Sequence, residues 1–159
     1  MLKNTIFYSL VIILVFGGQF LMTRGIVTGT PPVIQQTLLD GSQPMTRLAK
    51  GPALLYFWAD WCGVCRSMQG NVGLVLPDYP LVTVALRSGD AAAVQQYLAS
   101  RQLTWPVVND AEGGIAGQYG VQSVPALLFL NRQGQIVFST VGYTSEWGIR
   151  VRLWLASWV

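Results

Sequence analysis

The feature that most constrains the fold of this sequence is a pair of cysteines placed just after a run of apolar residues. Residues 53–58 read ALLYFW without a polar break, which is typical of a strand buried on both faces of a sheet. Cys62 and Cys65 follow in the segment WCGVC. Residues 62–76 are predicted to form a helix, weakened in its second half by two glycines. The cysteine pair is therefore expected where a central strand leads into a helix.

The spacing of the two cysteines indicates redox chemistry. Residues three apart face the same side of a helical turn, so Cys62 and Cys65 can reach disulfide geometry. Cys62 would lie at the helix N-terminus, where unpaired N–H groups stabilise a thiolate. We therefore expect Cys62 to be the nucleophile and the more buried Cys65 to resolve a mixed disulfide. An inert disulfide and a soft-metal site for Cu(I) remain alternatives.

Composition excludes several other classes of protein. Ten basic and seven acidic residues give a net charge of +3 with 11% of residues charged, which is too weak a signal for nucleic-acid binding. The sequence contains no histidine, which rules out Ser-His-Asp and Cys-His catalysis and His-bearing zinc sites. Two cysteines in all are too few for a four-cysteine zinc site or a scaffold of several disulfides.

The rest of the chain alternates strand and helix patterns. The expected strands are residues 34–39, 45–48, 81–86, 106–108, 125–130 and 135–141, with a hairpin loop at 131–134. The expected helices are residues 91–101, capped by Asp90, residues 113–119, and a last helix opened by Ser145. This order predicts an α/β fold whose mixed sheet is flanked by helices on both faces.

The last helix carries two apolar stripes. Trp147, Val151, Trp154 and Trp158 recur at helical spacing, and this stripe is predicted to pack on the sheet. The second stripe contains Ile149, Leu153 and Ala156. A contact of this helix with a membrane surface or a partner is the alternative.

An uncharged apolar segment, residues 6–22, lies near the N-terminus with one basic residue on each side. As a helix it would be roughly 26 Å long, at the lower limit for a bilayer span. Its end lacks the small residues of a cleavage site. We therefore expect residues 1–24 to be an uncleaved transmembrane anchor, residues 25–33 a linker, and residues 34–159 one globular domain; a removed signal peptide is the alternative.

Two segments resemble the signatures of the thioredoxin superfamily. Residues 57–66, FWADWCGVCR, look like its active-site segment, and residues 121–125, VQSVP, look like the segment that ends in a cis-proline. The resemblance is closest to membrane-tethered, TlpA-like thioredoxins. It implies a three-layer sandwich with a central mixed sheet. It also implies that Pro125 lies against the cysteine pair, that the backbone of Val124 binds substrate, and that Trp61 is an aromatic wall beside the nucleophile.

The chain departs from the superfamily pattern at one position that matters for proton transfer. Thioredoxins place a buried acid on the strand before the motif, and the matching residue here is Tyr56. Asp60 is the nearby acid, and we predict a proton-transfer role for it although its position resembles a solvent-facing one.

The resemblance implies a membrane-anchored thiol–disulfide oxidoreductase of the bacterial inner membrane, with its catalytic domain in the periplasm. It would reduce selected protein disulfides, in copper tolerance or cytochrome maturation. Its electrons would come from a membrane thiol reductase, and it would need no metal or cofactor beyond the Cys62–Cys65 disulfide. A disulfide-forming oxidase and a copper-binding protein that uses the two thiols are the alternatives.

Overall fold

The computed structural model describes residues 2–159, with their side chains except at positions 2–6, 12, 15, 16 and 20. The elements, in chain order, are α1 (Leu2–Thr23), α2 (Pro44–Leu48), β1 (Ala53–Trp58), α3 (Gly63–Ser67), α4 (Gln69–Val75), β2 (Leu81–Leu86), α5 (Ala91–Ser100), β3 (Val107–Asp110), α6 (Gly114–Gln118), β4 (Ala126–Leu130), β5 (Ile136–Val141) and α7 (Glu146–Ala156).

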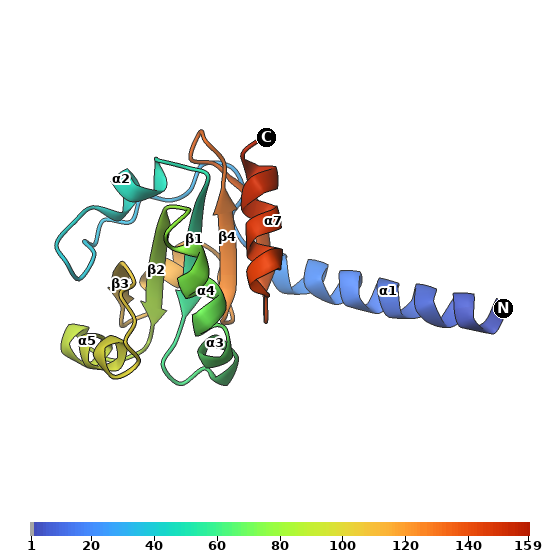
Figure 1. Cartoon of the computed structure of the whole chain (residues 1–159), viewed down its shortest axis with the longest axis horizontal. Helices are drawn as coiled ribbons and strands as arrows, with labels where there is room; N and C mark the ends of the chain where they lie inside the picture. Colours follow the sequence, from blue (N-terminus) through green and yellow to red (C-terminus); the bar gives the residue numbers. More distant parts are fainter. Residues whose placement is uncertain (1) are drawn as a thin grey trace.

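A five-stranded mixed sheet in the order β3-β2-β1-β4-β5 forms the centre of the domain (Figure 1). β2 runs parallel to β1 and β3, whereas β4 is antiparallel to β1 and β5. β1 and β2 are buried along their whole length, because both lie inside the sheet with side chains packed on both faces. Both strands have the predicted bounds, residues 53–58 and 81–86.

Helices cover both faces of this sheet. Successive side chains of a strand point to opposite faces, so β1 contributes to two cores. Leu55 and Phe57 pack in one core, to which α2 and α6 also contribute. Tyr56 and Trp58 pack in the other, with side chains of α3, α4, α5 and α7. The predicted mixed sheet flanked by helices is confirmed.

The two strands predicted before β1 are wrong. Residues 34–39 form no strand in the described structure. Ile34 and Leu38 are buried, but Gln36 between them is exposed, which does not fit the alternation of a half-buried strand. Residues 45–48 belong instead to helix α2, which begins at Pro44, a residue favoured at the first helical position.

The helix predicted over residues 62–76 is divided at Met68 into α3 and α4. Met68 is fully buried, and its Sδ accepts a hydrogen bond from the N–H of Thr144 at 3.4 Å. This contact holds the break in the helix against the segment that leads into α7.

The face of α7 that packs on the sheet is the opposite of the one predicted. The smaller stripe is buried, with Ile149, Leu153 and Ala156 at 0% exposure. The larger stripe faces outward, with Trp147 75%, Val151 50%, Trp154 56% and Trp158 76% exposed. Both stripes have helical spacing, so periodicity alone does not distinguish them.

Residues 25–33, the predicted linker, contact the domain through hydrogen bonds. The N–H of Val27 donates to the carbonyl of Tyr119 at 3.1 Å. Gly29 forms an isolated bridge with Ile136 of β5. The chain is therefore fastened to the sheet edge before the first core helix begins.

Helix α1 is held at the same edge. The side-chain amide of Gln19 donates to the carbonyl of Val141 at 3.0 Å and accepts from the hydroxyl of Thr140 at 3.3 Å. From this point α1 projects away from the domain (Figure 1). Within the part of the chain that the structure describes, no helix is long and apolar enough to cross a membrane.

Candidate functional site

Cys62 and Cys65 lie at the junction between β1 and α3 and form a disulfide, with their Cα atoms 5.2 Å apart. Cys62 is the N-cap of α3, in extended conformation, and its Sγ accepts a hydrogen bond from the N–H of Cys65 at 3.1 Å. A sulfur in this place has a backbone donor directed at it, and such a donor favours the thiolate over the thiol once the disulfide is reduced.

As predicted, Cys65 is more buried than Cys62. Cys62 is 7% exposed and Cys65 is 2% exposed. Cys62 also follows the exposed Trp61, and Val64 beside it is 45% exposed. The outer cysteine therefore lies within an apolar surface that an incoming polypeptide can contact.

The loop before β4 comes to the cysteine pair from another part of the chain. The peptide bond between Val124 and Pro125 is cis, as the resemblance implies. The carbonyl oxygen of Val124 lies 3.7 Å from the Sγ of Cys62. Val124 is only partly buried, and its carbonyl borders the Cys62 sulfur.

Trp61 is held by a residue that the sequence patterns did not single out. Its indole N–H donates to the carbonyl of Arg87 at 3.1 Å, while its ring is 60% exposed. The hydroxyl of Ser88 in the same turn accepts from the N–H of Asp60 at 3.0 Å. The turn after β2 thus supports the active-site segment, and the sequence signal for it is a Ser-Gly turn that follows a buried strand.

The structure places Asp60, the predicted proton-transfer residue, and Tyr56, which stands where thioredoxins have a buried acid, in different surroundings. Asp60 is half-buried. Its backbone carbonyl accepts a hydrogen bond from the guanidinium of Arg66 at 3.1 Å. Tyr56 is fully buried in the same core as both cysteines. Among the described residues its hydroxyl has no hydrogen-bond partner. Burial, with a smaller contribution from the neighbouring Tyr97, raises the pKa of Tyr56, so it stays neutral at physiological pH.

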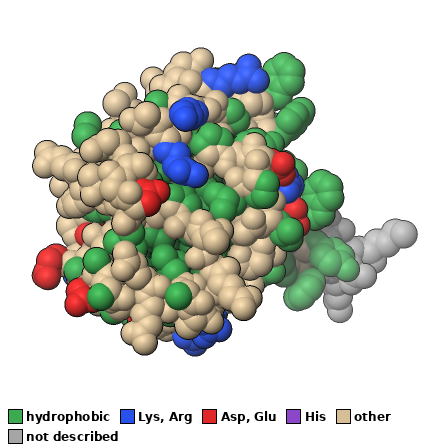
Figure 2. All heavy atoms as spheres, turned by 60° about the vertical axis from the view of Figure 1, so that its left-hand side comes forward, with side chains coloured by type: hydrophobic (Ala, Val, Ile, Leu, Met, Phe, Trp, Pro, Cys, Tyr) green, Lys and Arg blue, Asp and Glu red, His purple; other side chains and the backbone are tan. Residues whose placement is uncertain are grey.

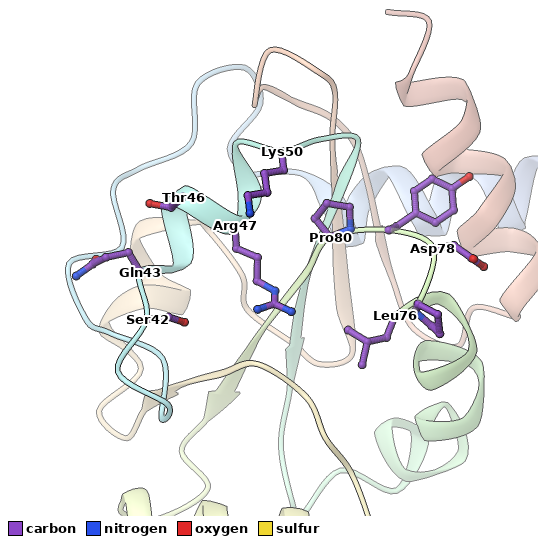
Figure 3. A pocket seen from close by; sticks show the side chains of 10 residues that line it. Ser42, Gln43, Thr46, Arg47, Lys50, Leu76, Asp78 and Pro80 are labelled. Carbon is purple, nitrogen blue, oxygen red and sulfur yellow. The ribbon is translucent and has the colours of Figure 1, made fainter.

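A hollow of about 630 Å³ lies at the other end of β1 and does not belong to this site. Lys50 and Arg47, which precede β1, line it together with Pro80, whose carbonyl accepts from the N–H of Leu54 at the start of the strand. Figure 3 shows Arg47 pointing into the hollow from α2. Within residues 2–159, no group of three or more histidine, cysteine or carboxylate side chains could hold a metal ion.

The fold and the cysteine pair are those of a thioredoxin-like protein, and comparison with known proteins assigns the family. Residues 32–139 match the model of the AhpC/TSA family. The match covers more than half of the chain, and the chain belongs to this family.

Individual relatives agree with this assignment. A thioredoxin-like protein of Haemophilus influenzae is 40% identical over 106 residues, which cover 66% of this chain and 63% of that protein. Thiol-disulfide oxidoreductase ResA of Bacillus thuringiensis is 26% identical over 157 residues, which cover 89% of this chain and 91% of the relative. The structure of dsbF of Mycobacterium tuberculosis superposes with a TM-score of 0.69 at 26% identity, covering 80% of this chain and 100% of that chain.

Proposed function

We propose that this chain is a protein thiol–disulfide oxidoreductase in which Cys62 attacks and Cys65 resolves. The observation that carries the proposal is the placement of the Cys62 sulfur. It accepts the Cys65 N–H, lies beside the Val124 carbonyl, and is the more exposed of the pair. The names of ResA and related oxidoreductases among the similar proteins support the same activity.

The reaction uses the two sulfurs in sequence. The thiolate of Cys62 attacks one sulfur of a substrate disulfide, forms a mixed disulfide and releases the other substrate sulfur as a thiolate. Cys65 then loses its proton and attacks the Sγ of Cys62, which releases the second substrate sulfur and forms the Cys62–Cys65 disulfide. Two electrons have passed from the protein to the substrate. A thiol donor must return them before the next turnover, and we propose a membrane thiol reductase for that step.

The two single-cysteine variants test the assignment, and each is the control for the other. Cys62→Ser is expected to abolish the reduction of insulin disulfides by the reduced protein. Cys65→Ser is expected to accumulate a mixed disulfide with the substrate, seen as a heavier species on a non-reducing gel and removed by dithiothreitol. Full exchange activity in Cys62→Ser would falsify the nucleophile assignment.

We propose in addition that the protein acts as a reductant. In thioredoxin-fold proteins the direction of electron flow follows the reduction potential, which is about −270 mV for thioredoxin and about −120 mV for the oxidant DsbA. Equilibration of the full chain with glutathione buffers is expected to give a value near or below about −200 mV. A value near the oxidant's would reverse the proposed direction and leave the two cysteines as the site.

We also propose that residues 1–24 hold the protein at the bacterial inner membrane, with the domain in the periplasm. The support is the uncharged segment 6–22 together with the large apolar side chains that α1 exposes, Phe7, Leu10, Ile13 and Leu14 among them. Expressed in a Gram-negative host, the protein is expected to resist carbonate extraction and to be digested by protease added to spheroplasts. Protection of the domain in intact spheroplasts would contradict the periplasmic placement.

A further inference from the structure

Helix α7 exposes an apolar face that the proposed redox reaction does not use. We call the outward stripe of Trp147, Val151, Trp154 and Trp158 the Trp face. Each of these side chains is at least 50% exposed, and the rings of Trp154 and Trp158 meet edge-on at 6.0 Å. Three exposed indoles along α7 and the turn that follows it form an apolar surface of a kind that marks an interaction site.

Rotation of α7 about its axis cannot bury the Trp face, because the stripe on the opposite side of the helix already packs in the core. Ile149 and Leu153 belong to the cluster beneath the sheet that also contains the cysteines. The Ser145 hydroxyl caps the helix by accepting from the N–H of Gly148 at 3.2 Å. The exposed indoles are thus a fixed property of the folded domain.

Of the charged side chains on α7, Glu146 and Arg150 are ion-paired, whereas Arg152 forms no ion pair with a described residue. Arg150 pairs with Asp78 and with Glu146, both at 2.7 Å. Arg152 donates to the carbonyl of Gly148 at 2.9 Å and lies 6.0 Å from the centre of the Phe129 ring. Figure 2 shows hydrophobic side chains projecting from the right-hand edge of the domain, next to a group of acidic and basic side chains. Attraction of an uncharged surface to this face therefore comes from the indoles, with Arg152 as one further charge beside them.

The position of α7 relative to α1 indicates what the Trp face meets. α7 lies on the side of the domain from which α1 projects, and its axis runs across that of α1 (Figure 1). The geometry is fixed by the Gln19 hydrogen bonds to β5 and by the packing of residues 25–33. If α1 enters a bilayer, α7 lies along the bilayer surface.

We propose that the Trp face is seated in the interfacial region of the lipid bilayer that holds α1. This inference rests on the proposed attachment of residues 1–24 to a membrane. Indole rings favour the headgroup region, where the ring is buried and its N–H stays hydrated. A helix in the interfacial plane with tryptophan on its apolar face fits this arrangement, and Arg150, already paired with Asp78 and Glu146, offers no free charge to a charged protein partner.

Quenching of tryptophan fluorescence by brominated lipid tests the proposal on the full chain. The protein is reconstituted in phosphatidylcholine vesicles with or without bromine on the upper acyl chain. The six tryptophans are Trp58, Trp61, Trp105 and the three of the Trp face, so α1 contributes none. Bromine is expected to quench the wild type, and the loss of Trp147, Trp154 and Trp158 by substitution with serine is expected to remove most of that quenching. High salt should leave it unchanged.

Trp61→Phe is the matched control, because it removes an exposed indole at the cysteine site and should retain the quenching. Equal quenching in the wild type and the triple serine variant would overturn the proposal. So would a dimer that forms in the wild type and is lost in the triple variant without any quenching, because the face would then meet a second copy. Co-flotation with vesicles reports attachment separately, and insulin reduction reports the redox function separately.

Discussion

Tyr56 and Tyr119 lie on opposite faces of the sheet, and each buries a phenol hydroxyl. The two hydroxyls differ in whether they form a hydrogen bond. The Tyr119 hydroxyl donates to the carbonyl of Pro32 at 2.6 Å, whereas that of Tyr56 has no partner within the described residues. Loss of a made hydrogen bond costs about 1 kcal/mol, and an unmade buried one carries a similar penalty. We expect Tyr119→Phe to lower the free energy of unfolding in urea by about 1 kcal/mol and Tyr56→Phe to raise it by about 1 kcal/mol. Equal destabilisation by both would show that the Tyr56 hydroxyl has a partner.

The same two residues predict how stability changes at high pH. Burial raises the pKa of both Tyr56 and Tyr119 above the value of about 10 that tyrosine has in an unfolded chain. Below about pH 10 both states keep these protons, and above it the unfolded chain releases protons that the folded chain retains. The free energy of unfolding should therefore fall as pH rises above about 10, and the fall should be shallower in Tyr56→Phe. An identical slope in this variant would contradict the assignment.

At the scale of the element, α7 gives the sharpest test of which face is buried. Leu153 is fully buried and Val151 is 50% exposed on the same helix. Leu153→Ala should lower the free energy of unfolding by about 2 to 5 kcal/mol, because it removes contacts and leaves a cavity. Val151→Ala should change it by less than about 0.5 kcal/mol, the usual range for surface substitutions. The reverse order in urea titrations would mean that the Trp face is buried.

The elements also show which features could be predicted from sequence. β1 and β2 were predictable to the residue, because β1 is a continuous apolar run and β2 is apolar except for Thr83. Residues 34–39 and 45–48 were not, because such short segments take their conformation from the core they pack against. The cysteine pair followed from its spacing, and the loop of Val124 from resemblance. Arg87 was missed because it acts through its backbone carbonyl, which no side-chain pattern reveals.

At the scale of the whole molecule, the side chain of Gln19 fastens α1 to the sheet. Its amide makes two hydrogen bonds to β5, and Gln19→Leu removes both. We expect this variant to keep its redox activity while the backbone of residues 25–29 exchanges deuterium faster and trypsin cuts more readily after Arg24. Gln36→Leu, at an exposed position, is the control and should behave as the wild type. Unchanged exchange in Gln19→Leu would mean that the packing of residues 25–33 alone holds the helix.

Because residues 25–33 are packed on the domain, the domain has little freedom to move relative to α1. A free coil of the same nine residues would let the domain range over roughly 15 to 18 Å, whereas here these residues follow the surface of the domain to β5 and Tyr119. On the proposed membrane, the cysteine pair then works at a fixed height and a fixed tilt. The protein can then reduce only substrates whose disulfides reach the cysteine pair at that distance from the membrane. A glycine-serine insertion after Arg24 should broaden the range of substrates, because it would let the domain move relative to the membrane.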